Sequence, residues 1–484
     1  MARTFFILEC AVLVLFAGVP AAQAQKSDPE TDNAPSQSTP PYPPMVSWAD
    51  TNETKMDSEQ LTPDQRLLTG VQPLTLGQYA EPHSFLLPSV NAVTQLDISP
   101  SNSANGSVSS ISYLLGRLDL HHVSGRSEIV LDYAGGGMIS AYGNNGNAAI
   151  QDLQFSDNIQ WQRWSLFVGD ETTYLSESPF GFGGVGGLGF LGGISQTAPG
   201  GALGGSLPFL NTGLTPSETI PTANVPRLSN TAVFQVGYQI SPRSSWTAAT
   251  SYGLLQFFGA GYIKSNSVLF QTGYNYQLSP VSTIGVLYQF DTFGFANLAP
   301  RIYDHLVELS YGRQITGRLG FRIAAGPEID VFPASLASPS NHLSWTLGSS
   351  LNYQVGRSAI SLSYDHLLTA GSGVLVGAET NQVQASASRN LSQRWVLLVT
   401  MGYARNQGLA QAAADAIEPT FKSWYASGQV NHQLRAGASI FFAYGMGLQG
   451  TNAATCTSSN CRKNYITEQL SMGLNWGLRP IELH

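Results

Sequence analysis

Residues 268–290 read VLFQTGYNYQLSPVSTIGVLYQF, and their alternation decides the fold. Before Ser279-Pro280, apolar and aromatic residues share one parity and small polar residues share the other, which is the period-two pattern of a β-strand with two different faces. Ser279-Pro280 marks a tight turn, after which the alternation resumes. The stretch therefore predicts a hairpin of two amphipathic strands. Its apolar positions are Val268, Phe270, Tyr274, Tyr276, Leu278, Ile284, Val286, Tyr288 and Phe290.

The same hairpin recurs from about residue 84 to residue 478. Connections on one side are short, whereas those on the other side are longer and more polar, as in residues 407–419 and 450–461. Short turns on one rim and long loops on the other are typical of transmembrane β-barrels. The predicted sharp turns are Ser124-Gly125-Arg126, a turn near Gln162, Ser241-Pro242, Ser279-Pro280, Thr316-Gly317, Val355-Gly356, Ser392-Gln393 and Arg435-Ala436-Gly437.

The composition is poor in charge. The chain has 484 residues, a formal net charge of −8, and only 11% charged residues, against about 25% in an ordinary soluble domain. Apolar residues alternate with Gln, Ser, Thr, Asn and Gly instead of forming long runs. A charge-poor, mildly acidic chain lacks the basic surface that nucleic acid requires, so we exclude nucleic acid as a partner.

The N-terminal region divides into two segments before the strands begin. Residues 1–24 combine Arg3, an apolar run and Ala22-Gln23-Ala24, which is the pattern of a cleavable signal peptide. Residues 25–83 are rich in Pro, Ser and Thr without a sustained period, which predicts a flexible periplasmic segment. Residues 84–484 form the third region, which has no apolar run of helix-spanning length. An exported chain of this kind spans a membrane only as a closed barrel.

We therefore predict an all-β fold, a closed antiparallel transmembrane β-barrel. The count is about eighteen strands if a weak first strand lies near residues 93–98, with sixteen as the alternative. Phe270, Leu347 and Phe442 are predicted to face lipid. Aromatic residues near strand ends, such as Trp395 and Trp476, suit the level of the lipid headgroups.

The region resembles the bacterial outer-membrane β-barrels of the porin-like family. The resemblance implies an outer-membrane location, contact with outer-membrane lipid, insertion by the barrel-assembly machinery, and passive diffusion of small polar solutes or ions. The residues themselves predict no cofactor and no metal. The resemblance leaves a homotrimer as one oligomeric state. One departure concerns the C-terminus. Family members usually finish on an aromatic residue, whereas this chain continues past Trp476 to His484.

The longest connection, residues 176–228, joins the fifth and sixth predicted strands. In porins this position carries the loop that folds into the lumen, so the resemblance makes Phe180, Gly183, Gly186 and Phe190 a candidate constriction. A flexible external loop is the equal alternative. Its G-x-G-x-x-G pattern lacks the βαβ context of a nucleotide site, so no nucleotide is predicted.

Parity places a set of charged side chains on the polar, inward face. In a water-filled lumen such groups set the field that ions experience, which favours a modest preference for cations. The alternative is that opposite charges pair across strands and only hold the wall, and we favour this for Arg117 with Asp132. The predicted pore-lining residues are Arg117, Asp119, His121, Glu128, Asp132, Asp304, Glu308, Arg322, Glu328, Asp365 and Arg394.

The sequence gives little support for catalysis or metal binding. His121-His122 and Asp365-His366 are neighbours, so within each pair the side chains point to opposite faces of a strand. Cys456 and Cys461 are predicted to form a local disulfide. The leading interpretation is a passive channel. The alternative is a non-conducting barrel that acts as an adhesin or receptor through its external loops, and a barrel-embedded hydrolase ranks lower.

Overall fold

The computed structural model describes residues 84–99, 107–142, 147–175, 219–222, 225–296, 298–332, 341–409, 419–435, 437–453 and 464–483. The chain divides into two compact units, Met1–Pro44 and Met45–His484. All described residues belong to the second unit. Within them, no helix is long and apolar enough to cross a membrane.

Strands make up nearly all of the described chain. The first nine are β1 (Phe85–Ser99), β2 (Ser107–Ser124), β3 (Ser127–Tyr142), β4 (Ala148–Gln160), β5 (Trp164–Leu175), β6 (Arg227–Ser241), β7 (Ser244–Phe257), β8 (Ser265–Ser279) and β9 (Ser282–Phe295). The others are β10 (Leu298–Thr316), β11 (Leu319–Val331), β12 (Asn341–Val355), β13 (Ser358–Thr369), β14 (Ala378–Asn390), β15 (Trp395–Gly408), β16 (Thr420–Arg435), β17 (Ala438–Thr451), β18 (Tyr465–Gly477) and the short β19 (Ile481–Glu482).

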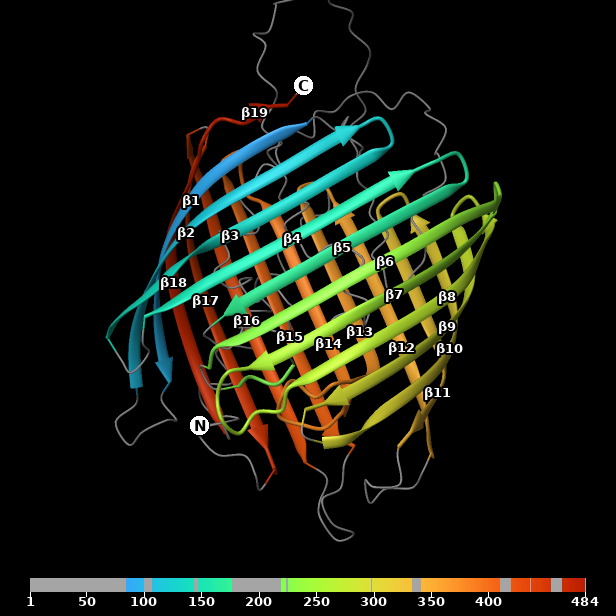
Figure 1. Cartoon of the computed structure of the whole chain (residues 1–484). Coiled ribbons are helices and arrows are strands. Elements are labelled where there is room, and N and C mark those ends of the chain that lie inside the picture. Colours follow the sequence, from blue (N-terminus) through green and yellow to red (C-terminus); the bar gives the residue numbers. More distant parts are fainter. Residues whose placement is uncertain are drawn as a thin grey trace, which may run out of the picture. The chain divides into compact units, whose positions relative to one another are not determined.

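The sheet closes on itself. Each long strand pairs antiparallel with the next one, and β1 pairs with β18 from Ser89 opposite Gly477 to Ile98 opposite Glu468. Figure 1 shows this seam, where the blue β1 lies beside the red β18. Because closure leaves no open sheet edge among the long strands, the backbone polar groups of the wall are paired within the protein. The predicted closed antiparallel barrel is confirmed.

The strand count follows from the first strand. The segment near residues 93–98 is part of β1, which pairs on both sides, so eighteen long strands close the barrel and the alternative of sixteen is excluded. After Trp476 the chain continues beside β1, where Ile481 and Glu482 oppose Leu86 and Phe85. The residues beyond the expected aromatic end therefore extend the seam.

The predicted turns define one rim, which we call the turn-side rim. The chain reverses at residues 125–126, 161–163, 242–243, 280–281, 317–318, 356–357 and 391–394, as the alternation predicted. The opposite end is the loop-side rim. It carries the longer connections, including residues 370–377 between β13 and β14.

The two faces of the wall differ in chemistry. Phe270 and Phe442 are 43% and 52% exposed on the outer face, and Leu347 has the same parity. Polar residues of the other parity, such as Gln271 and Thr231, are buried inside. A continuous exposed apolar surface is unfavourable in water and favourable against lipid. The outer face therefore suits a bilayer.

Candidate pore lining and mouth

The cross-strand register places the predicted pore-lining residues, with one exception, on the inner face. The exception is Arg394. The turn between β14 and β15 occupies Leu391 to Arg394, and the backbone N–H groups of Leu391 and Ser392 donate to the carbonyl of Trp395. Because the strand begins only at Trp395, Arg394 lies in the turn instead of on the wall.

Arg117 is the centre of a charged group on β2 to β4. Its Nε donates to Asp119 Oδ1 at 2.8 Å and to Asp132 Oδ1 at 2.9 Å, and a terminal nitrogen also bonds Asp132. Asp119 and Asp132 lie directly opposite each other, so the guanidinium separates two carboxylates that would otherwise repel. The favoured pairing of Arg117 with Asp132 is present in the structure.

A second pair lies nearer the turn-side rim. His121 Nε2 is 3.0 Å from Glu128 Oε1, and the His121 ring contacts the Phe85 ring with centroids 5.5 Å apart. These contacts join β1, β2 and β3 across the inner face. Both predicted residues therefore have a partner within the wall.

The densest acidic group is on β9 to β11, and we call Asp291, Asp304, Glu328 and Asp330 the acidic cluster. Asp304 lies directly opposite Asp291 on one side and Asp330 on the other. Ligand atoms of Asp304, Glu328 and Asp330 all lie within 4.8 Å of one another. Sequence reasoning selected Asp304 and Glu328 but missed Asp291 and Asp330. Asp330 could have been predicted from the sequence, because it has the same parity as Glu328, two residues earlier in the strand.

A further charged group lies between the acidic cluster and the turn-side rim. Thr346 Oγ1 donates to Glu308 Oε1 at 3.2 Å and to the His366 carbonyl at 3.0 Å. Arg322 is buried and is attracted by Glu308. Asp365 lies opposite Gly348 on the same inner face. The lumen wall is therefore charged over much of its height.

The wall parts between β12 and β13 near the loop-side rim. Their ladder ends at Leu347 opposite His366, although β12 begins at Asn341 and β13 continues to Thr369. Beyond that point Leu368 and Ala370 pack into a cluster with residues of β9, β10 and the end of β11. The loop-side ends of β13 and β14 therefore lean into the lumen.

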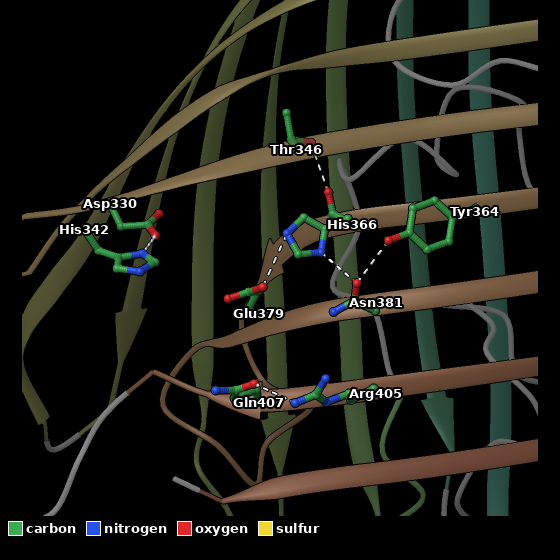
Figure 2. Close-up of polar contacts among 9 residues, drawn as sticks. All are labelled: Asp330, His342, Thr346, Tyr364, His366, Glu379, Asn381, Arg405 and Gln407. Atoms are coloured by element: carbon green, nitrogen blue, oxygen red, sulfur yellow. Dashed lines mark hydrogen bonds and ion pairs between the residues drawn. The ribbon is translucent and has the colours of Figure 1, made fainter.

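His366 lies where the two strands part, and Figure 2 shows its polar contacts. Its Nδ1 is 2.8 Å from Asn381 Oδ1 and its Nε2 is 3.3 Å from Glu379 Oε1. The ring stacks on Trp345 with centroids 4.0 Å apart. Tyr364 also donates to Asn381 Oδ1, at 3.1 Å. The stack on Trp345 therefore bridges β12 and β13, whereas the polar contacts join β13 to β14. Sequence reasoning did not anticipate these contacts.

The loop of residues 370–377, which we call the mouth loop, crosses the loop-side rim. Its Gly373 carbonyl accepts a 2.8 Å hydrogen bond from the backbone N–H of Ile263, in the connection after β7. Its Ser372 hydroxyl accepts a 3.0 Å hydrogen bond from the backbone N–H of Thr219. Gly371, Ser372, Gly373 and Gly377 have positive φ, which lets the loop coil tightly.

Residues 219–222, which we call the mouth segment, are the end of the connection between β5 and β6. Thr219 Oγ1 donates to Asn406 Oδ1 on β15 at 2.6 Å, and Gln449 on β17 donates to the Pro221 carbonyl at 3.2 Å. Ile220 is buried in a cluster with Leu375, Ala378, Phe421 and Ala453. The end of the longest connection therefore lies on the lumen side of the wall.

Several predicted features lie outside the described residues. They are the candidate constriction residues Phe180, Gly183, Gly186 and Phe190, the cysteines Cys456 and Cys461, and residues 1–24 and 25–83. Their assignments stay predictions.

Neither a protein-family profile nor a curated protein matches the sequence. Among solved structures, OccK2 (OpdF) of Pseudomonas aeruginosa is similar over 81% of this chain and 98% of its own, with 9% identity and a TM-score of 0.42. The outer membrane protein OpdK of Pseudomonas aeruginosa covers 81% and 98%, with 10% identity and a TM-score of 0.41. A BenF-like porin from Pseudomonas fluorescens covers 83% and 99%, with 9% identity and a TM-score of 0.42.

Proposed function

We propose that the chain is an outer-membrane channel through which small polar solutes or ions diffuse passively, with a preference for cations. The observation that carries the proposal is the pairing of an exposed apolar outer face with a charged, polar inner face around a closed barrel. The apolar outer face is stable in contact with lipid, whereas the charged, polar inner face is stable only in contact with water or polar solutes. A barrel with these two faces separates lipid from a polar interior.

Charge on the inner face supports the cation preference. Among the described residues, the arginines on that face are Arg117, Arg227 and Arg322, and Arg117 is already shared between two carboxylates. An excess of carboxylates lowers the energy of a cation in the lumen and raises that of an anion. The inner-face acids are Asp97, Asp119, Glu128, Asp132, Asp152, Glu171, Asp291, Asp304, Glu308, Glu328, Asp330 and Asp365.

The proposal extends to how the chain reaches the membrane. Residues 1–24 direct export, residues 25–83 remain a flexible periplasmic segment, and the barrel-assembly machinery inserts the barrel.

A homotrimer is tested by the mass of the complex extracted in mild detergent. No catalytic role is proposed.

A second function is favoured by the loop-side rim. The mouth loop and the mouth segment are largely buried. The loop is hydrogen-bonded to the connection after β7, and the segment is hydrogen-bonded to β15 and β17. Such packing favours a sealed barrel that acts as an adhesin or receptor through its external loops. The two functions differ in whether current passes through the folded protein.

Planar lipid bilayers separate these functions. Refolded protein is expected to give stepwise currents, and in a tenfold KCl gradient the reversal potential is expected to have the sign of cation selectivity. A heat-unfolded sample is the control for detergent leaks. Folded barrels without current would support the sealed barrel, and a reversal potential of zero would contradict the cation preference.

A further inference from the structure

We propose that a divalent cation, best matched by Ca²⁺, binds to Asp304, Glu328 and Asp330 on the inner faces of β10 and β11. Their ligand atoms all lie within 4.8 Å of one another. Two oxygens bound to the same Ca²⁺ at about 2.3–2.6 Å can be at most about 5 Å apart. The spacing therefore fits three oxygens around one ion without a change in the backbone.

The second observation is a set of buried oxygens without a donor. Asp304 and Asp330 are 1% and 2% exposed. Among the described residues, Asp304 Oδ1 and Asp330 Oδ1 are buried and accept no hydrogen bond, and the same holds for Asp291 Oδ1 on the next strand. A buried carboxylate oxygen without a partner is unfavourable. A cation between them supplies the missing interaction.

The barrel holds these groups together by its register. Asp291, Asp304 and Asp330 lie opposite one another on three adjacent strands, and Glu328 hydrogen-bonds to Asp304. Like charges directly across a ladder repel each other. A divalent ion bound among these carboxylates offsets two of their negative charges and so reduces the repulsion.

The ligand chemistry selects the ion. All three groups are carboxylates, and hard cations such as Ca²⁺ and Mg²⁺ prefer oxygen ligands. Ca²⁺ accepts irregular arrangements of six to eight oxygens, whereas Mg²⁺ requires a near-ideal octahedron. The three carboxylates are crowded together on a rigid wall. This arrangement suits Ca²⁺ better than Mg²⁺. His342 Nδ1, 3.3 Å from Asp330 Oδ2, orients that carboxylate from β12 (Figure 2).

A bound ion would also affect β13 and β14, the strands whose loop-side ends lean into the lumen. Glu379 on β14 repels Asp330 on β11, although Glu379 is held by His366. An ion on Asp330 reduces this repulsion between the wall and the leaning strands. Ca²⁺ is therefore expected to stabilise the folded barrel.

The test is thermal unfolding of the purified full chain in detergent, after removal of metals with EGTA. Added CaCl₂ is expected to raise the melting temperature, while NaCl at the same ionic strength is not. The double variant Asp304→Asn with Asp330→Asn is expected to melt higher than the wild type in EGTA, because the repulsion is removed, and to show no Ca²⁺ shift. Asp365→Asn, which removes an inner-face carboxylate outside the cluster, is the matched control and keeps the shift.

The proposal is overturned if Ca²⁺ does not raise the melting temperature of the wild type, or if the double variant keeps the full shift. Calorimetric titration gives an independent readout should the double variant not fold. One saturable Ca²⁺ site per chain is expected in the wild type and none in the single variant Glu328→Gln. An equal site in that variant would also overturn the proposal.

Discussion

The hydroxyl of Thr219 donates a 2.6 Å hydrogen bond to Asn406 Oδ1, which attaches the end of the connection between β5 and β6 to the inner face of β15. Asn406 Oδ1 also accepts a 2.8 Å hydrogen bond from Thr380 on β14. One buried amide thus links two strands of the wall to the mouth segment. We therefore expect this side chain to hold the mouth segment against the wall.

Asn406→Ala is expected to release the mouth segment. The change leaves the hydroxyls of Thr219 and Thr380 without their acceptor, which costs about 1–3 kcal/mol. Single-channel recording is expected to show a larger or noisier conductance than the wild type. Asn352→Ala, an inner-face asparagine on β12 near the turn-side rim, is the control and is expected to leave the current unchanged. Identical traces for the two variants would contradict a role for the mouth segment.

Gly373→Ala is expected to displace the mouth loop. An added Cβ would lie 2.1 Å from Phe257 Cε2, and the Phe257 ring is buried and stacked on Tyr262 with centroids 4.7 Å apart. The ring therefore has little room to move. We expect a lower melting temperature together with a higher conductance.

Gly356→Ala is the control for Gly373→Ala. It separates the steric contact with Phe257 from the cost of an alanine at positive φ. Gly356 also has a positive φ, +54°, but an added Cβ there meets nothing within 4 Å. Both variants carry the cost of an alanine in the left-handed region, about 1–2 kcal/mol. Only Gly373→Ala should change the conductance, and a similar change in Gly356→Ala would contradict the assignment.

Arg117→Gln is expected to destabilise the barrel and to strengthen the cation preference. Removing the guanidinium leaves Asp119 and Asp132 opposed without a counter-charge, and breaking a buried pair in this way costs about 3–5 kcal/mol. The melting temperature should fall, and the reversal potential should move further in the cation direction. Arg313→Gln, on the exposed outer face of β10, should change neither measurement.

Phe442→Lys tests the outer face. Phe442 lies mid-strand in β17 and is 52% exposed on the outer side, and a lysine at the bilayer midplane costs about 2–4 kcal/mol. Unfolding of liposome-inserted protein by urea is expected to need less denaturant. Ser363→Lys, on the inner face of β13, should show no comparable loss. Equal losses would mean that the two faces have been exchanged.

The alternation of side chains was sufficient to predict the barrel, because period two and turn residues are local properties of the sequence. The hairpin read from residues 268–290 corresponds to β8 and β9, with the turn at Pro280-Val281. Parity also placed Asp304 and Glu328 on the inner face. It failed for Arg394, since the four-residue turn before Trp395 shifts where the strand begins.

Other parts of the candidate site depend on contacts between distant segments. The gap in which His366 stacks on Trp345 arises because the β12–β13 ladder stops at Leu347 and His366. Nothing in a single strand indicates where a ladder ends. The glycines of the mouth loop do indicate tight coiling, but its contact with Ile263 joins parts of the barrel that sequence spacing does not relate.

The most direct test of a water-filled lumen is cysteine substitution along β14, in a background where Cys456 and Cys461 are replaced by serine. Gln384 and Ser386 face inward in the register, while Val383 and Ala385 face outward. A water-soluble methanethiosulfonate reagent is expected to reduce the bilayer current of the Gln384→Cys and Ser386→Cys variants and to leave the Val383→Cys and Ala385→Cys variants unchanged. Modification that follows the outward parity, or no effect at any of the four positions, would contradict the account.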